Sequence, residues 1–281
     1  MKYITEAYLI NCLTNLHVGS GANDVGAVDN LVQRDPVTRV PVIHSSSLKG
    51  ALREHFDTRT TVAEEVVRYV FGGDSLRRKD DKGMVGHYKF FQADLIAYPV
   101  RSNRTVFRRA VSLSQIETVC ERAQRLGVWQ DAASGTFDRS LFGLEGDVER
   151  LSPEKHQPMT DSSGELLESY LSTDGLVSST SETIGGNMAL FHPVDFQHLV
   201  TRLPAVARNE LKNGESKNLW YEEVVPRETR FLFLVSKPAH CLTDPQHREF
   251  ESQLSDCTVQ IGANGSIGYG FCSIQKIVPH E

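Results

Sequence analysis

The succession of hydrophobic and polar positions predicts a chain in which strands and helices follow one another. Residues 3–14, 88–100 and 229–236 are apolar runs rich in residues that favour strands. Two shorter strands are expected at 257–261 and 269–277. Strand candidates therefore lie near both ends of the chain and in its middle.

Four other segments are expected to be helices, namely 45–56, 61–71, 114–126 and 245–254. In the first of them, Leu48, Leu52 and Phe56 fall on one face at helical spacing. The second ends at a Phe-Gly-Gly sequence, which is a helix stop signal. Before the last, Asp244 followed by Pro245 is typical of an N-cap with proline at the first helical position.

The order of these elements indicates an α+β fold. Once the irregular parts are set aside, the order is β-α-β followed by β-α-β, the split βαβ or ferredoxin-like plan that RNA-recognition domains also use. Over residues 130–215 the pattern weakens into Ser-, Gly- and Thr-rich sequence. We therefore expect one domain over 1–281, with 130–215 as an insertion region of irregular segments and exposed hairpins.

Composition points to an ordinary globular protein. Hydrophobic residues make up 40% and charged residues 23% of the chain. No apolar run approaches the roughly 18–20 residues that a membrane span needs. The first residues do not have the layout of a signal peptide, so a cytoplasmic protein without membrane contact is expected. The cysteines are scattered, which favours reduced, buried thiols over disulfides or a zinc site: Cys12, Cys120, Cys241, Cys257 and Cys272.

The net charge of −6 disfavours a free-standing nucleic-acid-binding protein, whose surface is usually basic. The distribution of charge is more informative than the sum, because two basic clusters stand out. They are Arg101, Arg104, Arg108 and Arg109, and Arg77, Arg78, Lys79 and Lys82. Each cluster is either a solvated loop or a contact for nucleic acid.

A glycine-rich segment at 261–271 is the strongest loop signal near the C-terminus. It has neither the G-x-G-x-x-G fingerprint of dinucleotide-binding folds nor the G-K-[ST] of a P-loop. Four glycines in nine residues indicate backbone that takes positive φ or approaches a ligand closely, at Gly262, Gly265, Gly268 and Gly270. The alternatives are a plain hairpin turn and a backbone-lined contact for nucleic acid.

The helix expected at 45–56 has features of a phosphate site. A hydroxyl cap at Ser45 or Ser46 would leave free N–H groups pointing toward a ligand. Lys49 and Arg53 lie one turn apart on the same edge. Gly50 costs the helix about 1 kcal/mol relative to alanine, which suggests that something packs or binds close to it. The alternative is a capped surface helix with solvated basic residues.

The loop between the first strand and this helix carries candidate acid–base groups, His17 and Asp29. Asp24 and Asp35 compete with Asp29, although Asp35 precedes proline and is typical of a turn. Cleavage of RNA through its 2′-hydroxyl needs a proton acceptor, stabilisation of the charged phosphorane and often a divalent ion. A carboxylate next to histidine and basic groups could meet this need, but from chemistry alone a histidine or aspartate in a loop is more often structural than catalytic.

Two adjacent carboxylates, Glu222 and Glu223, follow two aromatic residues just before the strand at 229–236. This segment is either the edge of a site or the polar start of a strand. Both glutamates are therefore kept as weaker catalytic candidates.

Several stretches occur in one order along the whole chain, at 17–21, 26–29, 33–35, 41–43, 47–53, 98–102 and 261–271. Together they resemble the RAMP superfamily of CRISPR effector proteins, and within it the multi-copy backbone subunit of the type III-B (Cmr) complex. The combination is specific, although each motif is weak. The resemblance implies an RRM-like palm with a thumb-like hairpin formed by insertions.

The resemblance also implies a function. Copies of the subunit would stack along a guide crRNA into a filament with other Cmr subunits, and each copy would cleave paired target RNA. Asp29 falls on the family's cleavage residue and would assist the 2′-oxygen or hold a divalent metal, Mg or Mn; His17 falls on the loop histidine. The RNA-binding candidates are Ser45, Ser46, Lys49, Gly50, Arg53, Arg101, Gly262, Gly265, Gly268 and Gly270.

Two other functions stay open. A non-catalytic RNA-binding scaffold would need Lys49, Arg53 and Gly268 but not Asp29, whereas the carboxylate in the glycine loop favours an endoribonuclease. The other function is that of an α+β metabolic enzyme with a phosphorylated small substrate. Co-purification of RNA of defined length would exclude this hypothesis.

Overall fold

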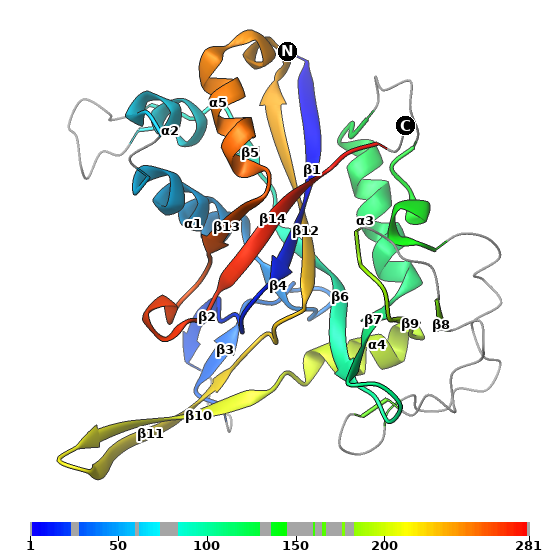
Figure 1. The fold of residues 1–281 in the computed structure, drawn as a ribbon, viewed down its shortest axis with the longest axis vertical. Helices are drawn as coiled ribbons and strands as arrows, with labels where there is room; N and C mark the ends of the chain where they lie inside the picture. The colour runs from blue at the N-terminus through cyan, green and yellow to red at the C-terminus, as the bar shows by residue number, and fades with distance from the viewer. Residues whose placement is uncertain are drawn as a thin grey trace.

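Two β-sheets organise the chain in the computed structural model (Figure 1). The structure describes residues 2–23, 28–59, 62–73, 84–129, 136–144, 160, 165–166, 176–177 and 183–279. The strands are β1 (Tyr3–Cys12), β2 (Gly19–Asn23), β3 (Asn30–Val32), β4 (Val42–Ile43), β5 (Lys89–Phe90), β6 (Ala93–Arg101), β7 (Phe107–Val111), β8 (Leu176–Val177), β9 (Met188–Leu190), β10 (Ala205–Lys212), β11 (Glu215–Glu223), β12 (Arg230–Pro238), β13 (Cys257–Gln260) and β14 (Phe271–Ile277). The α-helices are α1 (Ser45–Asp57), α2 (Glu64–Phe71), α3 (Leu113–Arg125), α4 (Pro193–Thr201) and α5 (Pro245–Leu254).

The large sheet has the order β13-β14-β1-β12-β6-β7-β9-β8, with β4 paired to β6 and β5 to β12. Its four central strands, β14, β1, β12 and β6, are each antiparallel to their neighbours. In the chain, α1 lies between β1 and β6, and α5 lies between β12 and β14. The expectation of a mixed α+β fold is therefore confirmed.

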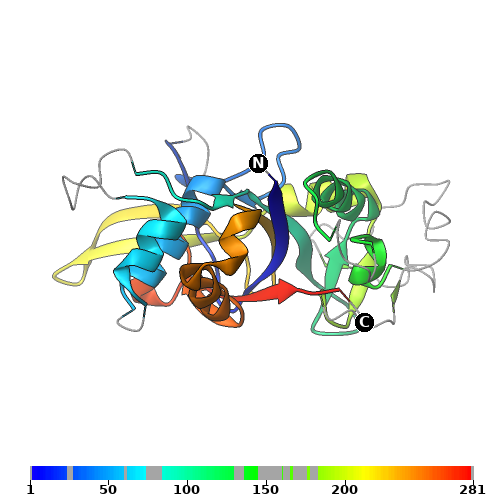
Figure 2. The same ribbon diagram turned by 90° about the horizontal axis from the view of Figure 1, so that it is seen from above.

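Each central strand of this sheet contributes to two hydrophobic clusters, because successive side chains of a strand point to opposite faces. In β1, Tyr8 and Ile10 pack with residues of α1, α2 and α5, whereas Ala7 and Leu9 pack with residues of α3. The helices accordingly lie on both sides of the sheet, with α1, α2 and α5 on one side and α3 on the other (Figures 1 and 2). No helix in the described residues is long and apolar enough to span a membrane.

Several elements differ in detail from their expected form. The single strand expected at 88–100 is divided into β5 and β6, although Phe91 between them still donates its N–H to the Leu234 carbonyl at 3.0 Å. Helix α5 begins at Pro245 with Asp244 at the N-cap, as expected, although the Asp244 side chain makes no capping hydrogen bond. Its carboxylate accepts a hydrogen bond from the Tyr69 hydroxyl at 2.5 Å and makes none to the helix. All cysteines are buried and free, as expected.

The second sheet is small and includes a hairpin that projects from the body of the protein (Figure 1). Its order is β10-β11-β3-β2, and β11 pairs in parallel with β3 through Glu222 and Asn30. Near the tip, Leu211 and Leu219 are 63% and 55% exposed. The base of the hairpin thus packs on the loop that follows β1, while its tip is free of the rest of the described chain.

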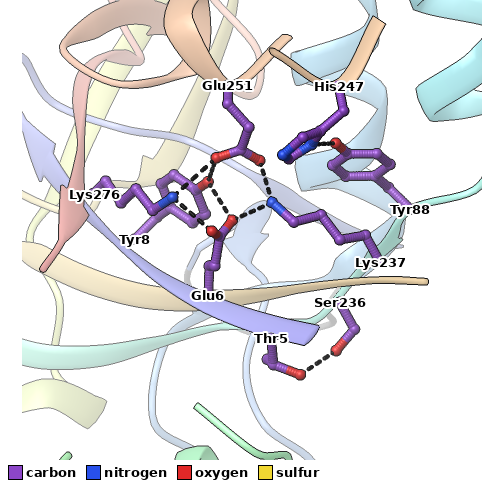
Figure 3. A network of polar contacts seen from close by, with 9 residues as sticks. All are labelled: Thr5, Glu6, Tyr8, Tyr88, Ser236, Lys237, His247, Glu251 and Lys276. Atoms are coloured by element: carbon purple, nitrogen blue, oxygen red, sulfur yellow. Dashed lines mark hydrogen bonds and ion pairs between the residues drawn. The ribbon is translucent and has the colours of Figure 1, made fainter. Parts of the chain in front are cut away.

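A network of charges fixes α5 to the large sheet (Figure 3). The ammonium group of Lys237, fully buried, lies 2.5 Å from Glu6 and 2.9 Å from Glu251. Lys276 lies 2.6 Å and 3.2 Å from the same two carboxylates. Tyr8 also donates to Glu251, at 2.7 Å. Two cations therefore balance two anions, which is the condition for keeping charge in a protein interior.

Candidate functional site

Asp29 lies in the turn that leads into β3 and is held against the hairpin. Its Oδ2 accepts a hydrogen bond from the Tyr221 N–H at 2.7 Å, and its own N–H donates to the Tyr221 carbonyl at 3.0 Å. Its Oδ1 makes no hydrogen bond or ion pair to the described residues, and the side chain is exposed. The main chain of β11 therefore fixes the carboxylate while one oxygen remains open to a ligand.

His17 is buried on the inner side of the same hairpin. Its Nδ1 lies 2.7 Å from the Glu223 carbonyl oxygen and 3.5 Å from the Glu222 carboxylate. The His17 carbonyl accepts a hydrogen bond from the Ala263 N–H at 2.8 Å. Asp29 and His17 thus bind neighbouring residues of β11, but no hydrogen bond joins them to each other in the part of the chain that the structure describes.

The carboxylates of Glu222 and Glu223 are buried and paired. Glu223 lies 2.5 Å from Arg34 and accepts the Val32 N–H at 3.1 Å. Glu222 accepts a hydrogen bond from the Asn264 side-chain amide and lies 3.5 Å from Nε of Arg208. The two glutamates therefore connect the hairpin to β3 and to the glycine-rich loop.

The expected hydroxyl cap of α1 is wrong. His44 is the N-cap and makes no side-chain cap bond, while Ser45 and Ser46 lie within the first turn. Gln33 fixes the start of the helix instead: its Oε1 accepts the His44 N–H at 2.8 Å, and its amide donates to the Ser47 hydroxyl at 2.8 Å. The helix start is thus anchored to the loop before it by a side chain that the sequence did not single out.

A groove of about 600 Å³ runs along one flank of α1. It is lined by Val18, Gly19, Gln33, Ser47, Gly50, Ala51, Glu54, His55, Thr58, Gln260 and Gly262. A Cβ atom on Gly50 would meet nothing within 4 Å, so this glycine faces open space and no segment of the described chain packs against it. The structure therefore brings two candidate glycines, Gly50 and Gly262, to one groove.

Lys49 and Arg53 lie on the other flank of α1. At 100° per residue they are roughly 150° around the helix from the middle of the groove wall. Arg53 donates to the Gly73 carbonyl at 3.4 Å, and the pKa of Lys49 is lowered by burial and by the positive charge of Arg53. Lys49 has no ion pair among the described residues. The groove and the basic flank are therefore two separate surfaces.

The glycines of the 261–271 segment have different reasons for being there. A Cβ on Gly262 would lie 2.3 Å from the His17 carbonyl oxygen, and one on Gly270 would lie 2.0 Å from that of Ile261. A Cβ on Gly265 would contact the Gln260 side chain at 3.0 Å, whereas Gly268 has φ of 83° with nothing nearby. Packing within the chain thus accounts for Gly262 and Gly270, and Gly268 faces outward.

Arg101 lies far from these surfaces. β6 begins at Ala93, which pairs with Ile43 of β4 just before the start of α1. Arg101 is the last residue of β6, so at about 3.3 Å per residue it lies roughly 25 Å from Ala93. Its side chain is exposed. In one subunit, Arg101 therefore cannot share a phosphate with Lys49. The second basic cluster, 77–82, lies outside the described residues.

The described residues hold no cluster of His, Cys, Asp or Glu that could bind a metal ion. Asp29 offers one open oxygen, and Asp24 lies outside the described residues. Asp35 accepts the N–H groups of Val37 and Thr38 at 2.9 Å and 2.8 Å, which confirms its role in a turn. Metal held by protein ligands alone does not fit this arrangement.

The chain is similar to proteins of one known family. The model of the RAMP superfamily matches residues 9–273. The CRISPR system Cmr endoribonuclease Cmr4 of Pyrococcus furiosus is 28% identical over 96% of this chain and 95% of its own length. The Cmr4 subunit of Saccharolobus solfataricus is 36% identical over 36% of this chain and 32% of its own.

Solved structures share the fold. A chain of the apo type III-B Cmr-beta complex superposes with a TM-score of 0.67 and 20% identity, covering 98% of this chain and 97% of that one. A crystal structure of Cmr4 gives a TM-score of 0.63 and 19% identity, with 98% and 100% covered. Since the family model spans nearly the whole length, the chain belongs to the RAMP superfamily.

Proposed function

We propose that this chain is the backbone subunit of a type III-B CRISPR effector complex, where copies of it bind a guide crRNA and cleave complementary target RNA. Its similarity over nearly the full length to a protein named as a Cmr endoribonuclease supports the assignment. The observation that carries the catalytic part is Asp29, whose exposed carboxylate accepts a hydrogen bond from the hairpin main chain while its backbone N–H donates a second one to the same residue.

The fold supports a division into palm and thumb. The antiparallel order β14-β1-β12-β6, with α1 and α5 on one side, is that of a ferredoxin-like palm. The projecting hairpin β10–β11 is then the thumb (Figure 1). Its exposed tip is suited to contact a neighbouring copy or other subunits, while Asp29 lies beside its base.

Asp29 would act on the attacking group of RNA. Its open oxygen accepts the proton of a 2′-hydroxyl, the 2′-oxygen bonds to the adjacent phosphorus, and the bond from phosphorus to the 5′-oxygen breaks. The products are a 2′,3′-cyclic phosphate and a 5′-hydroxyl, whose proton comes from water. No step is assigned to a metal ion, because the described residues offer one open carboxylate oxygen here.

The other candidates have supporting roles. His17, Glu222 and Glu223 are buried and bonded to the hairpin or the glycine-rich loop, so they position Asp29 through β11. Lys49 and Arg53 supply the basic flank on which a guide phosphate is held. The groove on the opposite flank, which has Gly50 and Gly262 but no lysine or arginine in its lining, is suited to sugar and base groups.

The test uses complexes assembled on guide RNA. Asp29→Asn keeps an oxygen that can accept the Tyr221 N–H but removes the negative charge. We expect target cleavage to be lost and guide binding to be unchanged, whereas the control Glu121→Gln, an exposed carboxylate on α3, keeps both activities. Unchanged cleavage by Asp29→Asn would show that the subunit is a scaffold and that cleavage occurs elsewhere.

A further inference from the structure

Two arginines outside the proposed cleavage site lie close together on the large sheet. Arg230 begins β12 and Arg109 lies in β7, with β6 between them: Ala97 pairs with Arg230 and Pro99 with Arg109. A Cβ atom on Gly185 would lie 3.3 Å from Nη2 of Arg230 and 3.6 Å from Nη1 of Arg109. The two guanidinium groups therefore meet beside this glycine.

This pair carries more positive than negative charge. Nη2 of Arg109 lies 2.7 Å from the Glu228 carboxylate, and no other carboxylate contacts the pair in the part of the chain that the structure describes. Burial and the charge of Arg109 lower the pKa of Arg230 to about 10, while Glu228 acts in the opposite direction. Two half-buried cations thus share one anion.

The pair also has unused hydrogen-bond donors. Nη1 of Arg109 donates to the Gly186 carbonyl at 2.8 Å, and Nη1 of Arg230 donates to the Thr183 carbonyl at 2.7 Å. The Nε groups of both arginines are buried without a partner, and Nη2 of Arg230 makes no hydrogen bond to the described residues. A ligand from outside cannot reach the two buried Nε groups, but Nη2 of Arg230 is not among the buried unpartnered atoms and remains free to donate to such a ligand.

The neighbouring side chains on this face of the sheet suit RNA. Asn11 pairs with Arg230 across β1 and β12, and its Oδ1 is also without a partner. Further along the same face, Leu13 and Phe271 are 45% and 39% exposed. Exposed aromatic rings are common platforms for single-stranded bases. Because alternate residues of β1 and β14 pack with α1 and α5, this face is opposite to α1.

We propose that Arg109 and Arg230 form a binding site for an RNA phosphate on the sheet face opposite α1. The proposal rests on the RNA-binding function above and adds a site that is separate from Lys49, Arg53 and Asp29. The excess positive charge and the open Nη2 donor of Arg230 match a phosphate, whose oxygens accept bonds from planar guanidinium groups. The phosphate could belong to the guide or to the target strand.

The test compares Arg230→Gln with Arg230→Lys, because lysine keeps the charge. Arg125→Gln is the control, since this arginine is 83% exposed on α3. Affinity for a labelled single-stranded RNA is measured by fluorescence anisotropy over a range of salt. For Arg230→Gln we expect about tenfold weaker binding and a salt slope smaller by about 0.7, the value of one phosphate contact on a single strand. Arg230→Lys should keep most of the slope.

Two arms separate the sources of the phosphate. In the first, RNA binds the protein alone; in the second, a complementary RNA binds complexes already assembled on guide. Loss in the first arm assigns the site to the guide, and loss only in the second assigns it to the target. If Arg230→Gln leaves affinity and salt slope unchanged in both arms, the site is overturned. It is also overturned if Arg230→Lys loses as much affinity as Arg230→Gln, or if Arg230→Gln changes the oligomeric state of the protein without RNA. If the unmodified protein binds no RNA, the proposed function itself fails.

Discussion

The buried charge network gives the most quantitative prediction. Lys237→Met removes a fully buried cation, and Lys276 is then the one cation left beside Glu6 and Glu251 among the described residues. Breaking a buried pair from one side costs about 3–5 kcal/mol, because the remaining charge is uncompensated. Since Lys276 still contacts both carboxylates, we expect the lower end, about 3 kcal/mol. For a chain of this size that lowers Tm by about 5 °C.

Denaturant unfolding of the single and double variants tests this reasoning. Lys237→Met combined with Glu251→Gln leaves the pair of Glu6 and Lys276, 2.6 Å apart, so we expect the double variant to recover about 2 kcal/mol. Lys276→Met, 29% exposed, should cost less than Lys237→Met. A cost below about 1 kcal/mol for Lys237→Met, or simple addition in the double variant, would refute a balanced four-charge network.

The same network sets an acid limit. Burial raises the pKa of the Glu251 carboxyl, but the positive charges of Lys237 and Lys276 have the larger, opposite effect. The pKa is therefore lowered to about 2. A carboxyl with a depressed folded pKa contributes stability above its unfolded pKa and loses it as pH falls through the folded value. The contribution of Glu251 is therefore present at neutral pH and lost between its ordinary pKa and about 2. In Lys237→Met the loss should begin at higher pH.

Three further predictions concern RNA and the glycine-rich loop. Gly262→Ala should destabilise the protein by about 3 kcal/mol, because the new Cβ would meet the His17 carbonyl, whereas Gly268→Ala, in open space, should cost about 1 kcal/mol, measured by urea unfolding. Lys49→Gln should weaken guide binding about tenfold in a filter assay, while Ser46→Ala should not change it. Addition of EDTA should leave guide binding intact. If EDTA abolishes target cleavage, RNA supplies metal ligands beside Asp29; if cleavage is retained, no metal is needed.

Periodicity in the sequence was sufficient to predict most of the large sheet and the helices on it. The core positions of β1 and α1 are strongly apolar, and burial of such positions decides both elements. The hairpin β10–β11 was not placed, because most of its side chains are exposed and carry no apolar alternation. Helix α4 was missed as well, although proline at its first position was a usable signal.

The site shows a similar division. Asp29 could be proposed from the resemblance, but the groups that fix it come from residues 192 positions away, which no local pattern indicates. The separation of Lys49 from the groove was in principle predictable, because 100° per residue places it on another flank. The double role of Gln33 depends on tertiary contacts with His44 and Ser47 and could not be read from spacing.

The central claim is that Asp29 cleaves the target strand. The most direct measurement is single-turnover cleavage of a target RNA by complexes assembled with Asp29→Asn and with the unmodified subunit. Loss of a general base predicts a fall in rate of about 10²- to 10⁴-fold at equal guide occupancy. A rate within about threefold of the unmodified complex would contradict the assignment, since acid–base catalysis by this carboxylate cannot be so small.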